Sequence, residues 1–289
     1  MNFEIWYHPA PIDWFVRMGM IYPAVWIIVL FWVFAMGACL GSFLNVCIWR
    51  IPRGESLSKA SSHCTTCGTP IRWYDNLPVL SYLILRGRCR SCRTSYSSSY
   101  FFVESLCGIL FVMMVLKTGW MKQTPEIIPA HAAIIFFAIG CAVIDWKHQI
   151  IPDKLTYSMI GCGIIFSLLL PGAWGMENRW DSLRLCVASG TIPGAFVALF
   201  ALASKWSKNG KVMGWGDVKF VLGAGMLIGL PGILFALLAG SITGCGAGMV
   251  MKRKHIAFGP FLAGGCLIWV FAGNFLLDWY KQICLLMIK

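Results

Sequence analysis

The chain has 289 residues, of which 58% are hydrophobic and only 12% are charged, and its mean hydropathy is +0.71. This composition excludes an ordinary soluble domain and is typical of a membrane protein with several spans. The formal net charge is +12. The basic residues are not interleaved with aromatic residues in a stacking pattern, so no nucleic-acid partner is expected.

Apolar runs occur along most of the chain, and about 20 helical residues suffice to cross the roughly 30 Å of bilayer hydrocarbon. We therefore predict an all-α polytopic membrane protein with about eight transmembrane helices. Their expected ranges are 24–48, 100–116, 127–144, 155–170, 183–203, 218–230, 233–251 and 256–279. Residues 1–20 are not expected to form a cleavable signal peptide, because they contain Glu4, Pro11 and Asp13 and no basic start.

The basic residues indicate how these helices are oriented. The loops after the first, third, fifth and seventh predicted spans, together with Lys219 at the start of the sixth span, hold 17 of the 24 Lys and Arg residues. Because basic residues accumulate on the cytoplasmic side, we place these loops there and both termini on the opposite side of the membrane. The excess charge also predicts attraction to anionic membrane lipids.

The one long polar stretch, residues 49–99, is expected to be a small cytoplasmic loop domain between an N-terminal segment (1–48) and a membrane core (100–289). It contains two C-x2-C pairs, Cys64 with Cys67 and Cys89 with Cys92, and 21 residues lie between the two pairs. This spacing can place four thiolates around Zn²⁺, and four cysteines leave no open position, so we predict a structural zinc site. A redox dithiol or inert cysteines are the alternatives.

Two aspartates at the ends of predicted spans are the candidate catalytic residues. Asp145 ends the third span, and Asp217 begins the sixth within Gly214-Trp215-Gly216-Asp217-Val218-Lys219. Ionisable residues are costly in a membrane helix and indicate function by default. Two close carboxylates cannot both ionise cheaply, so together they can activate water and protonate a leaving amine. The alternative is that Asp217 only caps its helix and is neutralised by Lys219.

The helix ends also predict a division of roles between the two carboxylates. Asp145 ends its helix, where the helix dipole disfavours negative charge, so Asp145 is the expected acid. Asp217 begins its helix, where the dipole favours negative charge, so Asp217 is the expected base. Gly214 and Gly216, which lack a Cβ, are expected to let substrate backbone approach. Glu104, near the start of the second span, is equally consistent with a functional acid and with a partner of backbone or Arg groups.

Taken together, these residues resemble those of the bacterial type IV prepilin peptidases, aspartic proteases of the G-x-G-D type. This resemblance implies a location in the bacterial inner membrane, with both termini in the periplasm. The resemblance covers almost the whole chain. It rests on Gly41-Ser42-Phe43-Leu44-Asn45-Val46, the four-cysteine loop, Asp75-Asn76-Leu77-Pro78-Val79-Leu80-Ser81-Tyr82, Arg86-Gly87-Arg88-Cys89, Val103-Glu104, Ile144-Asp145 with Ile151-Pro152-Asp153, Gly214 to Lys219, and Phe258-Gly259-Pro260-Phe261. Thr65 departs from the proline that is usual in the first cysteine pair.

This resemblance implies an endopeptidase that removes the basic leader from type IV prepilins and type II secretion pseudopilins. Cleavage would follow a glycine, which usually precedes a phenylalanine, at the cytoplasmic face. Asp145 and Asp217 match the catalytic aspartates of the family. Members with the four-cysteine loop commonly also methylate the new N-terminal amine with S-adenosylmethionine, for which the sequence locates no binding site.

Other functions remain open at this point. An intramembrane protease with other substrates could use the same G-x-G-D motif. A cation-coupled transporter could use two membrane aspartates, although it would not explain the cysteine loop. A membrane scaffold with a zinc module would leave the aspartates unexplained.

Overall fold

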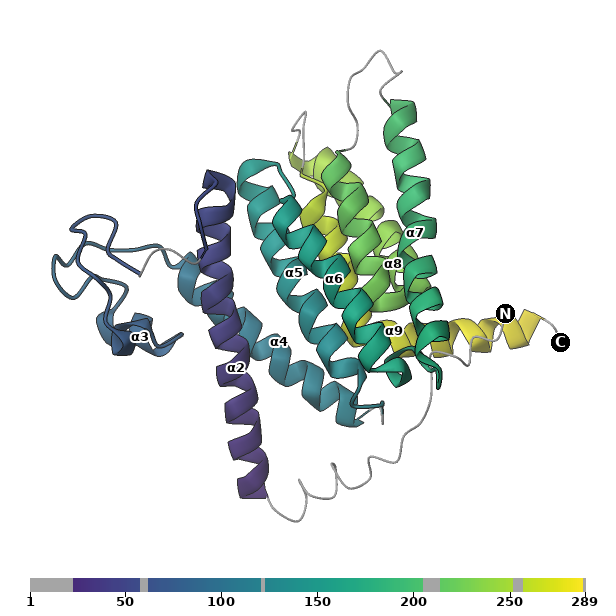
Figure 1. Cartoon of the computed structure of the whole chain (residues 1–289), viewed down its shortest axis with the longest axis horizontal. Coiled ribbons are helices and arrows are strands. Elements are labelled where there is room, and N and C mark those ends of the chain that lie inside the picture. Colours follow the sequence, from purple (N-terminus) through teal and green to yellow (C-terminus); the bar gives the residue numbers. More distant parts are fainter. Residues whose placement is uncertain (1–22, 58–61, 121–122, 205–213, 252–256, 288–289) are drawn as a thin grey trace. The chain divides into compact units, whose positions relative to one another are not determined.

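The computed structural model describes residues 23–57, 62–120, 123–204, 214–251 and 257–287, and within these ranges it is built from helices without any strand. The chain divides into two compact units. Among the described residues, the N-terminal unit comprises 23–119 and the C-terminal unit begins at Trp120 (Figure 1).

The N-terminal unit consists of two long helices and the loop that joins them. Its elements are α2 (Pro23–Arg50), η2 (Ile51–Arg53), η3 (Trp73–Asn76), α3 (Leu80–Leu85) and α4 (Ser99–Trp120). Glycines allow α2 to approach α4 closely, because a Cβ on Gly41 would lie 2.8 Å from the Cα of Glu104. A Cβ on Gly37 would likewise meet the Phe111 side chain at 2.8 Å.

The C-terminal unit is a bundle of helices that lie side by side (Figure 1). Its elements are α5 (Ile127–His148), α6 (Asp153–Leu169), η4 (Pro171–Trp174), α7 (Arg179–Ser204), α8 (Trp215–Met251) and α9 (Gly259–Met287). Helix α8 packs against α6, α7 and α9. Fully buried apolar residues such as Ile134, Phe220 and Leu262 form the core between these helices.

Helix α8 is broken near its middle. Gly229 has φ 73° and ψ 170°, a backbone conformation that is open to glycine and lies outside the helical region. Pro231 follows two residues later and lacks the N–H that would continue the helical hydrogen bonds. The break therefore lies where the sequence predicts that its sixth and seventh spans separate.

The protein is a multi-pass membrane protein. In the ranges that the structure describes, six helices are long and apolar enough to cross a bilayer, namely α2, α4, α5, α7, α8 and α9. Helix α6 has 17 residues, and α8 contains both the sixth and the seventh predicted runs in its 37 residues. The number of eight spans and the orientation in the membrane stay predictions.

Some expectations fall outside the described residues. These are the absence of a signal peptide in residues 1–20 and the predicted cytoplasmic positions of Lys205, Lys208, Lys211, Lys252, Arg253 and Lys254. The predicted segments 1–48, 49–99 and 100–289 stay a prediction, and by compactness α4 groups with α2 and the cysteine loop. The close approach of α4 to Gly37 and Gly41 gives the physical reason for this grouping.

Candidate active site and candidate metal centre

Asp145 lies in the last turn of α5 and is buried, with 6% of its surface exposed. The helix ends because Gln149 adopts a left-handed conformation with φ 54° and donates its N–H to the Asp145 carbonyl at 2.8 Å. The Asp145 carboxylate accepts a hydrogen bond at 2.9 Å from the N–H of Gly259, the first residue of α9. This contact joins positions 114 residues apart.

Asp217 lies in the first turn of α8 and is half-buried. Its carboxylate accepts the N–H of Gly214 at 3.1 Å, while its own N–H donates to the Gly214 carbonyl at 3.2 Å. These two bonds hold the G-x-G-D segment in a tight turn that leads into the helix. The Asp217 carboxylate thus accepts a backbone N–H at the start of α8. The predicted role as a helix cap and a catalytic role are therefore compatible with each other.

Contacts between α8 and the α5–α6 connection bring the two aspartates together. A Cβ on Gly216 would lie 2.9 Å from the Cβ of Ile151, so this glycine lets the start of α8 pack closely on the connection. The Lys219 ammonium forms an ion pair with Asp153 at 2.7 Å. As a result, Asp145 lies close enough to Asp217 for its charge to act on the Asp217 carboxylate.

Three details of the predicted site change. Gly216 was expected to make room for substrate, but its missing Cβ makes room for Ile151. Lys219 was considered as the group that neutralises Asp217, but it pairs with Asp153. The α9 N-terminus also favours charge on Asp145, so the dipole of α5 no longer provides a physical reason to make Asp145 the acid.

Gly259 is a positioning residue. The sequence analysis includes it in the motif Phe258-Gly259-Pro260-Phe261, but nothing in the sequence connects it with Asp145, which is 114 residues away. A Cβ on Gly259 would lie 2.6 Å from Oδ2 of Asp145, so Gly259→Ala should displace that carboxylate. If Asp145 is catalytic, we expect the cleavage rate to fall about 10²-fold, because a shift of about 1 Å in a reacting group has such an effect.

The measurement is the rate of prepilin cleavage in membranes at equal protein level. Gly264→Ala is the matched control, since nothing lies within 4 Å of a Cβ at this other glycine of α9. Equal rates for Gly259→Ala and the wild type would show that Gly259 does not position a reacting group.

The four cysteines of the loop converge, as their spacing predicts. Their sulfur atoms all lie within 4.8 Å of one another. The Sγ atoms of Cys64 and Cys92 are 3.8 Å apart. With Zn–S bonds of about 2.3 Å, tetrahedral geometry places neighbouring sulfurs about 3.8 Å apart. The cluster can therefore bind a metal ion.

The two halves of the cluster have the same local structure. In the first, Cys64 donates its N–H to Thr69 at 3.0 Å and accepts the N–H of Gly68, which has φ 69°. In the second, Cys89 makes the equivalent bonds with Thr94 and Arg93, which has φ 61°. Each half is thus a tight turn that points a pair of thiols in one direction.

The first turn also favours the thiolate form of Cys64, which is the form that metals bind. Backbone N–H groups of Cys67 and Thr66 lower the pKa of the Cys64 thiol from 9.0 to about 6. Nearby, Arg90 donates two hydrogen bonds from Nε and Nη2 to Asp75 and holds the pKa of that carboxyl below its usual range. This ion pair joins the second turn to η3.

The fold and these sites define a class: a multi-pass membrane protein with two neighbouring aspartates at helix ends and a four-cysteine metal centre. Two family models match the chain. Residues 35–118 match the bacterial peptidase A24 N-terminal domain, and residues 132–249 match the type IV leader peptidase family.

Similar proteins cover most of the chain. A prepilin leader peptidase/N-methyltransferase of Neisseria gonorrhoeae is 32% identical, and the match covers 78% of this chain and 85% of that protein. One from Aeromonas hydrophila is 30% identical, and the match covers 86% of this chain and 92% of that protein. No solved structure matches. The chain therefore belongs to the type IV leader peptidase family.

Proposed function

We propose that this protein is a prepilin leader peptidase and N-methyltransferase that processes type IV prepilins and type II secretion pseudopilins. It hydrolyses the peptide bond after a glycine, usually Gly-Phe, and then methylates the new N-terminal amine. The observation that carries the peptidase proposal is the proximity of Asp145 and Asp217, which come from different helices of a chain in this family.

The two carboxylates can divide the chemistry of hydrolysis between them. An ionised carboxylate removes a proton from water as the water oxygen attacks the glycyl carbonyl carbon. The protonated carboxyl hydrogen-bonds to the carbonyl oxygen, and the C–N bond then breaks as the leaving amine takes up a proton. We assign Asp145 and Asp217 to this pair as a unit.

The position of the pair supports cleavage where a substrate enters the membrane. Both aspartates lie in a terminal turn of their helices, which favours this proposal over cleavage in the middle of a substrate's span. With the excess of basic residues in alternate loops, we place the site at the cytoplasmic face of a bacterial inner membrane and the termini in the periplasm. Anionic lipids would concentrate the basic leader there.

Two further components belong to the proposal. Cys64, Cys67, Cys89 and Cys92 hold a structural Zn²⁺, which four thiolates would coordinate without an open position for water. S-adenosylmethionine is the methyl donor, in keeping with the names of the similar proteins.

The test is intact-mass spectrometry of a prepilin that is co-expressed with this protein in a host without such an enzyme. We expect the mature pilin to lose its leader and to gain the mass of one methyl group at its N-terminus. An unprocessed prepilin would contradict the peptidase proposal, and a cleaved but unmethylated pilin would contradict the methyltransferase proposal.

A further inference from the structure

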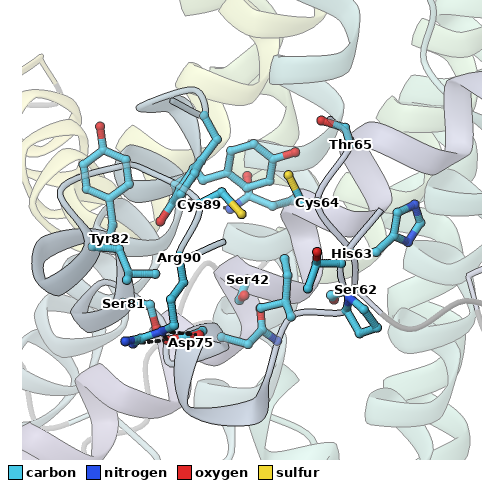
Figure 2. Close-up of a pocket in the computed structure, with 18 of the residues that line it drawn as sticks. Ser42, Ser62, His63, Cys64, Thr65, Asp75, Ser81, Tyr82, Cys89 and Arg90 are labelled. Carbon is cyan, nitrogen blue, oxygen red and sulfur yellow. Dashed lines mark hydrogen bonds and ion pairs between the residues drawn. The ribbon is translucent and has the colours of Figure 1, made fainter. Parts of the chain in front are cut away.

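A cavity of about 610 Å³ lies within the N-terminal unit, between α2, the cysteine turns and the start of α4. Figure 2 shows Cys64 and Cys89 on one side of this cavity and the ion pair of Asp75 and Arg90 on another. Small-molecule sites commonly have volumes of about 300–1,000 Å³. The cavity is therefore large enough for a nucleoside-sized ligand, and it does not include either candidate catalytic aspartate.

Glu104 is the buried acid of this cavity, with 9% of its surface exposed. Its carboxylate accepts the N–H of Val79 at 2.8 Å, and the side chains of Ser42 and Asn45 also lie within hydrogen-bonding reach. In the described part of the chain, no Lys or Arg forms an ion pair with it. A buried carboxylate without a basic partner favours a cationic ligand, because an unpaired buried charge is costly.

Val79 does not line the cavity, but its backbone, which hydrogen-bonds to Glu104, gives a second reason to regard the surroundings of Glu104 as functional. Val79 has φ 64° and ψ −52°, an unfavourable conformation for a β-branched residue. The hydrogen bond to Glu104 helps to hold this conformation. Backbone strain of this kind is concentrated at binding and catalytic sites.

Aromatic rings line the same cavity. Tyr82, Tyr96 and Tyr100 contribute to its wall. Tyr96 meets Tyr82 edge to face with ring centroids 5.5 Å apart, and it meets Tyr100 similarly at 6.2 Å. Aromatic faces and edges suit both a planar base and an organic cation.

We propose that this cavity binds the methyl donor S-adenosylmethionine, with Glu104 as the counter-charge of its sulfonium group. The inference rests on the proposed methyltransferase function and assigns a binding site to it. The tyrosines match the adenine ring, and Glu104 matches the positive sulfur. Asp75 is a poorer counter-charge because Arg90 already neutralises it, and Glu55 is exposed to solvent.

The charge of Glu104 also suits the direction of the reaction. The lone pair of the substrate's neutral N-terminal amine forms a bond to the methyl carbon, while the carbon–sulfur bond breaks and its electron pair stays on sulfur. The positive charge thereby moves from sulfur to nitrogen. The remaining thioether, S-adenosylhomocysteine, is neutral at sulfur and loses its attraction to Glu104, which favours release of this product.

The test is equilibrium binding of S-adenosylmethionine and of S-adenosylhomocysteine to the purified full-length protein without prepilin. We expect Glu104→Gln to weaken binding of the sulfonium ligand about tenfold or more, because it removes one partner of a buried charge pair. Binding of the thioether should change less than about threefold, because there is no charge on its sulfur. Retained thioether binding also shows that the cavity is intact.

Glu55→Gln is the matched control, since it removes an exposed carboxylate from the lining of the same cavity. We expect it to change both affinities less than about twofold, because solvent screens this charge. Equal losses for both ligands in Glu104→Gln, or unchanged affinity for both, would overturn the role of Glu104 as counter-charge.

Ultraviolet cross-linking of radiolabelled S-adenosylmethionine to the wild type locates the ligand independently of any variant. Peptide mapping should place the adduct within residues 42–104. An adduct in the C-terminal unit would overturn the site while leaving the methyltransferase proposal intact. A wild-type protein that binds neither ligand would contradict the methyltransferase proposal itself, and peptidase activity would still be tested separately.

Discussion

Asp145→Asn and Asp217→Asn should each lower prepilin cleavage by about 10³-fold or more, because each removes a group that holds or transfers a proton in the reaction. Asparagine is nearly isosteric with aspartate, and its side-chain oxygen can still accept the N–H of Gly259 or Gly214. The fold should therefore survive. Since both residues serve one chemical step, the double variant should be little worse than either single variant.

The measurement is the initial rate of leader removal in membranes that contain equal amounts of each variant. Asp278→Asn is the matched control, because Asp278 is an exposed aspartate of α9 outside the candidate site, and it should cleave at the wild-type rate. Additive losses in the double variant would show that the two aspartates act in separate steps.

In the N-terminal unit, removal of two of the four cysteines should cause a large loss of bound zinc and of loop stability. Cys64→Ser with Cys67→Ser leaves half of the ligand set, so bound zinc should fall from about one ion per chain toward zero. The loop that contains the cluster has few buried residues, and metal binding would supply much of its folding free energy. Cys64 and Cys89 also line the cavity, so methylation should suffer at least as much as cleavage.

Elemental analysis and limited proteolysis of the purified proteins check this result. Cys245→Ser is the control, because it removes an exposed cysteine outside the cluster and should retain zinc. Wild-type protein that was purified without chelators and contains no zinc would contradict the zinc proposal.

Local patterns predicted much of this structure. The two C-x2-C pairs predicted a cluster because each pair forms its own tight turn, with hydrogen bonds that span about five residues. The apolar runs predicted the long helices, and Pro231 marked the region where α8 breaks. These features depend on residues that are close together in the sequence.

Contacts between distant residues were not predictable in the same way. The bond from Gly259 to Asp145 joins two helices, so the charge environment of Asp145 could not be read from α5 alone. The same applies to Glu104, whose partner is a backbone N–H 25 residues away. That partner, Val79, has a positive φ that nothing in a valine side chain indicates.

The most direct test of the proposed chemistry uses purified protein and purified prepilin in liposomes, with no other protein present. The mass of the pilin N-terminus is followed over time for the wild type, for Asp217→Asn and for Asp278→Asn. We predict complete removal of the leader by the wild type and by Asp278→Asn, and an intact prepilin with Asp217→Asn. Near-normal leader removal by Asp217→Asn would contradict the assignment of Asp145 and Asp217 as the catalytic pair.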